Sequence, residues 1–162
     1  MERVARLIVA SQLVLRRADA EDCRNLFRWR NEEVTRGYSG DGQPLSWETH
    51  RQWFDDVLGR GDRLLVIGER DGHPVGVLRF DLDGRQATIS VYLVPGNQGS
   101  GLGTALIEAE MRYLAQHTPE IAEIIARVSV HNRASIGAFE GAGYIINSFQ
   151  FKRMLKVSNE NR

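Results

Sequence analysis

The most constraining feature of this sequence is a strand that ends at a proline and is followed at once by a glycine-rich turn and an apolar helix. Residues 89–94 alternate as a β-strand does, and Pro95 ends the alternation. The turn then places glycines at positions 99, 101 and 103, where they let a ligand come close to the backbone. The first turn of a helix offers unpaired amides and the positive end of its dipole. We therefore expect an anion site here, suited to a phosphate or pyrophosphate.

Two common phosphate-binding motifs do not fit this turn. A P-loop needs Lys and then Ser or Thr after its last glycine, and a dinucleotide fingerprint needs a third glycine where this chain has Thr104. A glycine-rich turn that binds nothing is the competing interpretation, because glycines also serve tight packing and helix starts.

A second block, about thirty residues later, makes the binding interpretation more specific. A strand precedes Asn132-x-x-Ser135, and a helix with Phe139 follows and ends before Gly143-Tyr144. Together with Gln98-x-x-Gly101-x-Gly103, this block resembles the GNAT N-acetyltransferase superfamily. The resemblance implies an α/β (α+β) fold with a mixed, mostly antiparallel central sheet flanked by about four helices. It also implies acetyl-CoA as co-substrate and no metal.

The resemblance assigns a set of residues to acetyl-CoA. The strand before the loop would bind the pantetheine arm and acetyl carbonyl through its free backbone groups. The loop would hold the pyrophosphate, and the later block would contact the rest of the molecule. The implied residues are Val91, Leu93, Gln98, Gly99, Ser100, Gly101, Leu102, Gly103, Thr104, Asn132, Ser135 and Phe139. Asn132 also suits a purely structural role as a helix N-cap.

Periodicity and turn residues predict the remaining elements. Two helices are expected, one opened by Asp19 and one capped by Ser46. Asp71-Gly72 and Asp83-Gly84 predict tight hairpins within an antiparallel meander. The expected strands span residues 12–16, 63–70, 73–81, 85–94, 124–130 and 144–157, and the later helices span 102–118 and 132–143.

Length and composition favour one domain at residues 12–157, with tails at 1–11 and 158–162. Basic and acidic residues number 21 each, so no excess charge favours nucleic acid as a partner. The single Cys23 allows no internal disulfide and suits a reducing cytoplasm, and a small buried residue is favoured over a reactive thiol. No apolar run is long enough to predict a membrane span or a secretory leader.

The catalytic groups are less clear from the sequence. Many relatives carry a tyrosine at the position of Phe139 that protonates the departing thiolate, so Tyr144, Tyr92 or a water is left as the proton source, unless the thiolate leaves unaided. Relatives often place a Glu near the start of the strand that precedes the loop, and this chain has none there. The candidate bases are Asp81, which ends a strand, and His131, because histidine as a residue type is a common general base. Each also suits a structural role.

Acceptor recognition is expected among the first two helices and one later strand. The candidate residues are Arg30, Asn31, Arg36, His50 and Arg79, since a guanidinium suits phosphate, although a solvated face is the competing interpretation. This region resembles the branch that contains the UDP-amino-sugar acetyltransferase of pseudaminic-acid biosynthesis and the N-terminal acetyltransferases of ribosomal proteins. This resemblance implies a small-molecule acceptor, namely a nucleotide-linked amino sugar. A protein N-terminus, a small amine and a catalytically silent CoA-binding module are the alternatives, and the oligomeric state, a homodimer included, stays open.

Overall fold

One mixed sheet organises the residues that the computed structural model describes, 13–37 and 42–148. Its strands run in the order β1-β2-β3-β4-β5. They are β1 (Leu13–Arg17), β2 (Arg63–Arg70), β3 (His73–Asp83), β4 (Gln86–Leu93) and β5 (Glu123–Ala126). The first three pairings are antiparallel, and β4 pairs with β5 in parallel. The predicted mixed, mostly antiparallel sheet is therefore confirmed.

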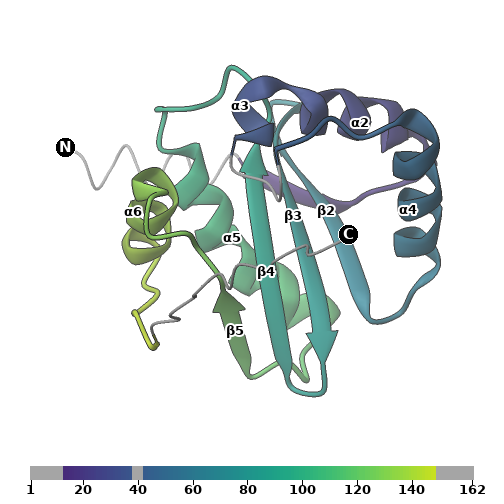
Figure 1. Ribbon diagram of the computed structural model, residues 1–162. Helices are drawn as coiled ribbons and strands as arrows, with labels where there is room; N and C mark the ends of the chain where they lie inside the picture. The colour runs from purple at the N-terminus through teal and green to yellow at the C-terminus, as the bar shows by residue number, and fades with distance from the viewer. Residues whose placement is uncertain (1–12, 38–41, 149–162) are drawn as a thin grey trace, which may run out of the picture.

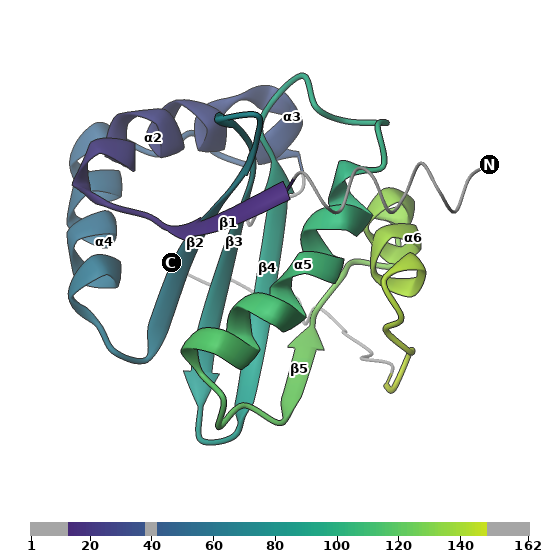
Figure 2. The same cartoon turned by 180° about the vertical axis from the view of Figure 1, so that it is seen from behind.

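Helices cover both faces of this sheet (Figure 1). One face carries a 3₁₀ turn (Ala20–Asp22) and the helices α2 (Cys23–Asn31), α3 (Glu33–Arg36) and α4 (Trp47–Gly59). The other carries α5 (Leu102–His117), seen in front of the sheet in Figure 2, and α6 (Arg133–Gly141) beside it. The short α3 makes five α-helices in the described residues, where about four were expected.

Side-chain caps start the helices where the sequence predicts. Ser46 Oγ accepts a hydrogen bond from Thr49 N at the start of α4, and Asn132 Oδ1 accepts one from Ser135 N at the start of α6. Asp19 and Asp22 form a reciprocal capping box, but the helix they open begins with the 3₁₀ turn. These bonds satisfy amides that have no partner within the helix.

The two predicted hairpins differ in their outcome. Asp71 and Gly72 both have left-handed φ angles, 53° and 75°, as a two-residue type I′ turn requires. The prediction of Asp83-Gly84 as the second turn was wrong by one residue, because Asp83 still pairs with Gln86 in the ladder. The turn residues are Gly84 and Arg85, and in the described chain only Gly84 of these two has a left-handed φ, 58°.

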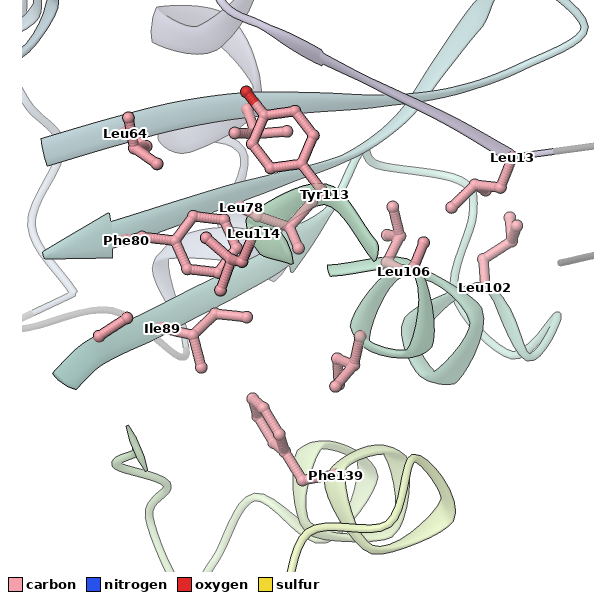
Figure 3. Close-up of a cluster of buried hydrophobic side chains, with 14 of the residues drawn as sticks. Leu13, Leu64, Leu78, Phe80, Ile89, Leu102, Leu106, Tyr113, Leu114 and Phe139 are labelled. Carbon is pink, nitrogen blue, oxygen red and sulfur yellow. The ribbon is translucent and has the colours of Figure 1, made fainter. Parts of the chain in front are cut away.

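The sheet separates two apolar cores because successive side chains of a strand point to opposite faces. Leu64, Phe80 and Ile89 pack with α5 and with Phe139 of α6 (Figure 3). Alternate residues of the same strands pack with α2 and α4 on the other face.

A pair of glycines lets α5 come close to the sheet. Gly68 and Gly76 face each other across β2 and β3. A Cβ on either would lie 2.2 Å from a methyl carbon of Leu106, which is fully buried. The side chain of Leu106 therefore fills the space that two missing side chains leave, and this fixes the helix that begins at the glycine-rich turn.

Four predicted segments fall wholly or partly outside the described residues. These are the tails at 1–11 and 158–162, the first residue of the strand expected at 12–16, and most of the expected last strand, residues 144–157. The described part of that strand, residues 144–148, has no regular secondary structure.

Candidate active site

The sheet opens beside the second half of β4. The parallel pairing with β5 ends at Ile89 and Ala126, whereas β4 stays paired with β3 as far as Leu93. The backbone of residues 90–93 therefore has no strand on its β5 side in the described chain. The prediction that the strand continues to Val130 was wrong. Val128 packs against the core while Val130 is exposed, so the apolar alternation there reflects contact on one side and not ladder pairing.

The glycine-rich turn lies at the end of this opened strand. Gly99 and Gly101 have left-handed φ angles of 77° and 74°, which only glycine adopts without strain. Two side chains order the turn from within: Gln98 Oε1 accepts from Gly96 N at 2.9 Å, and Ser100 Oγ donates to the Asn97 carbonyl oxygen at 2.8 Å. The turn therefore has a defined conformation, held by its own hydrogen bonds.

Helix α5 presents its N-terminus at this loop. Its N-cap is Gly101, and within the described residues no side chain caps it. The amides of Leu102, Gly103 and Thr104 therefore point out of the helix without an intrahelical partner, at the positive end of a sixteen-residue dipole. Gly103 has no left-handed φ; a Cβ there would lie 3.6 Å from the Ala138 Cβ on α6. Its small size thus serves the contact between α5 and α6.

A cleft of about 770 Å³ runs from this loop along the opened strand to α2. It brings together, from the predicted acetyl-CoA set, Val91, Leu93, Gln98, Gly103, Asn132, Ser135 and Phe139. From the predicted acceptor set it includes Arg30 and Arg79, and from the predicted catalytic set it includes His131. A side pocket of about 240 Å³ adjoins it, and Arg30, Arg79, Trp53 and Tyr92 line both.

The cleft is basic. Its described lining holds the side chains of Arg30, Arg79, Arg127 and His131 and no Asp or Glu. In a concave site with apolar walls, such a charge balance raises the local concentration of anions. The described lining therefore suits a negatively charged ligand better than a polycation.

Two predicted catalytic residues lie elsewhere. Asp81 contacts two guanidinium groups, with Oδ1 3.1 Å from Arg63 Nε and Oδ2 3.0 Å from Arg79 Nη2, and it does not line the cleft. The hydroxyl of Tyr144 donates a hydrogen bond to Glu110 Oε1, and Tyr144 is also absent from the described cleft lining. Its ring packs edge-on against Phe139, with 5.0 Å between the centroids.

Two of the predicted acceptor-binding residues make hydrogen bonds to the protein's own backbone. The side-chain amide of Asn31 bonds both to the carbonyl oxygen and to the amide of Leu45, at 3.0 and 2.8 Å. Arg36 donates to the carbonyl oxygens of Asn31 and Gly42. These contacts hold together the two ends of the connection between α2 and α4, and they place Leu45 in the wall of the side pocket.

His50 lines the side pocket but is buried, with 1% of its surface exposed. Phe27, Trp47, Trp53 and Phe54 surround its ring, with centroid distances of 5.3–6.2 Å in this aromatic group. Burial lowers the pKa of the imidazole, so the ring is neutral, and its Nε2 donates to the Cys23 carbonyl oxygen at 3.0 Å. The ring therefore joins α4 to α2.

The sequence interpretation missed several residues of the cleft. Ser90, Arg127 and Trp53 line it. Ser90 follows the last residue of β4 that pairs with β5, and Arg127 follows the end of β5. Because the apolar alternation of residues 124–130 runs past the end of the ladder, the sequence offers no signal that marks these positions.

The structure shows neither a membrane-spanning helix nor a metal cluster in the parts of the chain that it describes. No helix there is long and apolar enough to cross a membrane. Among the same residues, no three His, Cys, Asp or Glu side chains gather into a metal-binding group.

Comparisons with known proteins agree with this geometry. A family model described as acetyltransferase (GNAT) domain matches residues 12–145. The fold is similar to that of AAC(6′)-Ib in complex with paromomycin and acetyl-CoA, at 25% identity over 82% of each chain and a TM-score of 0.71. It is also similar to spermidine N-acetyltransferase from Vibrio cholerae in complex with CoA and spermine, at 19% identity over 85% of this chain and 83% of that one, TM-score 0.75.

A third solved structure is RimL, the ribosomal L7/L12 α-N-protein acetyltransferase, in complex with CoA. The identity is 21% over 86% of this chain and 84% of that one, with a TM-score of 0.75. A comparison with curated protein sequences found no match.

Proposed function

The chain belongs to the GNAT acetyltransferase domain family, and we propose that it acetylates the 4-amino group of a UDP-linked amino sugar. As a member of this family it is an acetyl-CoA-dependent N-acetyltransferase with the GNAT fold. The acceptor and the roles of individual residues belong to the proposal.

The loop and the start of α5 bind the pyrophosphate of acetyl-CoA in this proposal. Support comes from the left-handed Gly99 and Gly101 and from the unpaired amides of residues 102–104. The pantetheine arm lies along the opened edge of β4, where Val91 and Leu93 offer backbone groups that no neighbouring strand uses in the described chain.

Acetyl-CoA supplies the thioester whose carbonyl carbon the acceptor amine attacks. The same backbone amides of β4 stabilise the negative charge that forms on the carbonyl oxygen. His131 is the proposed base for the amine proton, because it lines the cleft and carries an imidazole. Tyr92 is the proposed proton donor to the departing thiolate, because it is the one phenol in the described cleft lining.

The basic lining of the cleft carries the acceptor assignment. A diphosphate can pair with the guanidinium groups of Arg30 and Arg79. Polyamines and aminoglycosides, the molecules named for two of the structural neighbours, are polycations and need carboxylates that the described lining does not hold. A protein N-terminus is the second candidate, favoured by the similarity to RimL.

Acceptor competition tests this proposal. Purified enzyme with acetyl-CoA is given a UDP-linked 4-amino-4,6-dideoxy sugar, the same sugar without UDP, a ribosomal N-terminal peptide or spermidine. Free thiol and acetylated product are measured. We expect the UDP-sugar to have the highest kcat/KM and the free sugar to be far poorer, because the nucleotide supplies binding and orientation. Faster acetylation of the peptide or of spermidine would overturn the assignment, and thiol release with no acceptor would indicate hydrolysis alone.

A further inference from the structure

Three charged side chains form a row across the sheet face that carries α2 and α4. Arg63 on β2 is the cross-strand partner of Asp81 on β3, and Arg79 is two residues before Asp81 on the same face. Asp81 lies 3.1 Å from Arg63 and 3.0 Å from Arg79. Because Arg79 also lines the cleft and its side pocket, the row runs from the end of the sheet into the cleft.

The row leaves one buried donor without a partner. Arg79 Nε is buried and has no hydrogen-bond partner among the described residues, whereas Asp81 Oδ1 lies 3.1 Å from Arg63 Nε. A buried N–H without a partner costs free energy, and native structures rarely keep one without a ligand or water to satisfy it. An oxyanion in the side pocket would accept from N–H groups of Arg79 that Asp81 does not use, while Asp81 keeps Nη2.

The surroundings of Arg79 fit an oxyanion. Arg30 lines the same side pocket, and Ser90, an exposed residue, is the cross-strand partner of Arg79. The pocket of about 240 Å³ has the apolar side chains of Leu26 and Leu45 in its wall, which keep the local dielectric low. No described carboxylate lines this pocket.

We propose that Asp81 is a positioning residue, which holds the guanidinium of Arg79 so that this group binds a phosphate of the acceptor in the side pocket. Arg63 braces Asp81 from the other side. This inference rests on the proposed nucleotide-linked acceptor, and it gives Asp81 a role in binding in place of proton transfer. Because both carboxylate oxygens of Asp81 contact guanidinium groups and the residue does not line the described cleft, Asp81 is not placed to take a proton from the acceptor amine.

The variant Asp81→Asn tests the role, because it keeps the volume and removes the charge. If Asp81 is a positioning residue, the Asp81→Asn variant raises KM for the UDP-sugar roughly tenfold and leaves kcat within about threefold. A larger increase in KM is not expected, because the ion pair of Asp81 with Arg79 is partly exposed to solvent. The acidic limb of the pH profile of kcat stays in place. If Asp81 were the general base, kcat would fall by about 10²–10⁴ and that limb would flatten, which would overturn the proposal.

A binding measurement separates this inference from the proposed function. UDP is titrated by calorimetry into enzyme saturated with CoA, so that the glycine-rich loop is already occupied. We expect Asp81→Asn and Arg79→Lys to weaken UDP binding about tenfold, Asp81→Glu to restore part of it, and CoA affinity to stay constant. Unchanged UDP affinity in folded Asp81→Asn overturns the inference. UDP binding that depends on Asp81, in an enzyme that does not acetylate UDP-sugars, supports the subsite and rejects only the acceptor.

Asp55→Asn is the matched control. Asp55 also pairs with an arginine, Arg51, at 3.4 Å, but it lies on the exposed side of α4 outside both cavities. This variant loses the same charge, so a general effect of net charge on UDP binding would appear in it equally. We expect its UDP affinity and KM to match those of the wild type.

Discussion

Replacing Gly101 with alanine tests the acetyl-CoA site most directly. Gly101 is the N-cap of α5 and has a φ of 74°, and a Cβ there would meet no heavy atom within 4 Å. The folded protein therefore has room for the methyl group, and the cost to folding is the left-handed conformation alone, about 1–2 kcal/mol. For a chain of this size, that cost lowers the melting temperature by several degrees and leaves the protein folded at 25 °C.

The effect on CoA binding should be larger than the effect on folding. The methyl group would stand in the open space at the helix N-terminus, where we place the pyrophosphate. A hydrogen bond from a backbone amide to a charged group contributes about 1.5–3 kcal/mol, so losing one weakens CoA binding by about 10- to 150-fold. Calorimetry at 25 °C measures this change directly, and Gly101→Val should give an effect at least as large.

Gly84→Ala is the matched control for backbone strain. Gly84 also has a left-handed φ, 58°, and open space around its Cβ position, but it lies in the β3–β4 hairpin at the opposite end of β4 from the loop (Figure 1). We expect a similar loss of melting temperature and wild-type CoA affinity. If folded Gly101→Ala binds CoA within threefold of Gly84→Ala, the amides at the start of α5 do not hold the pyrophosphate.

Three further predictions concern the core and the cleft wall. Gly76→Ala should lower the free energy of unfolding by about 1–3 kcal/mol in urea titrations, because its Cβ would overlap Leu106; an unchanged value would contradict the close packing of α5. Burial raises the pKa of Glu110 from 4.5 to about 7. The folded protein therefore binds this proton more tightly than the unfolded chain, and stability should fall between pH 4.5 and pH 8 by on the order of 3 kcal/mol. Glu110→Gln should remove this slope, and parallel slopes would exclude Glu110 as its source. Phe139→Tyr should keep or raise kcat, because it adds a hydroxyl to the cleft wall; a large loss would mean that the apolar contact with Tyr144 matters more.

The parts of the fold that the sequence predicts well are those that local chemistry decides. Ser46 and Asn132 cap the helices that follow them, and both residues of Asp71-Gly72 adopt the left-handed conformation that their types favour. The loop before α5 is also local, since its glycine spacing and the helix after it are adjacent in the chain. For the same reason, the sequence alone allows a specific prediction for this half of the cleft.

The predictions that failed concern residues whose structure depends on contacts between distant segments of the chain. The alternation of residues 124–130 predicts a strand, but the ladder ends at Ala126, where the chain leaves β4 and opens the cleft. The buried Glu110 had no sequence signal, because its only hydrogen-bond partner among the described residues is Tyr144, which lies 34 positions later. Its carboxyl oxygen Oε2 has no partner in the described part of the chain. Periodicity places such a residue on a helix but does not show what covers it.

The arginines show why the acceptor half of the cleft was harder to assign. From the sequence, Arg36 and Arg79 are equal candidates, because a guanidinium suits a phosphate wherever it stands. In the structure Arg36 donates from Nε and Nη1 to the carbonyl oxygens of Asn31 and Gly42, so these two nitrogens serve the fold. Arg79 has one side fixed by Asp81, while Nε stays buried without a described partner beside the cleft. What separates a structural arginine from a binding arginine is thus the set of acceptors that the fold brings to it, and this set exists only after β3 has paired with β2 and β4.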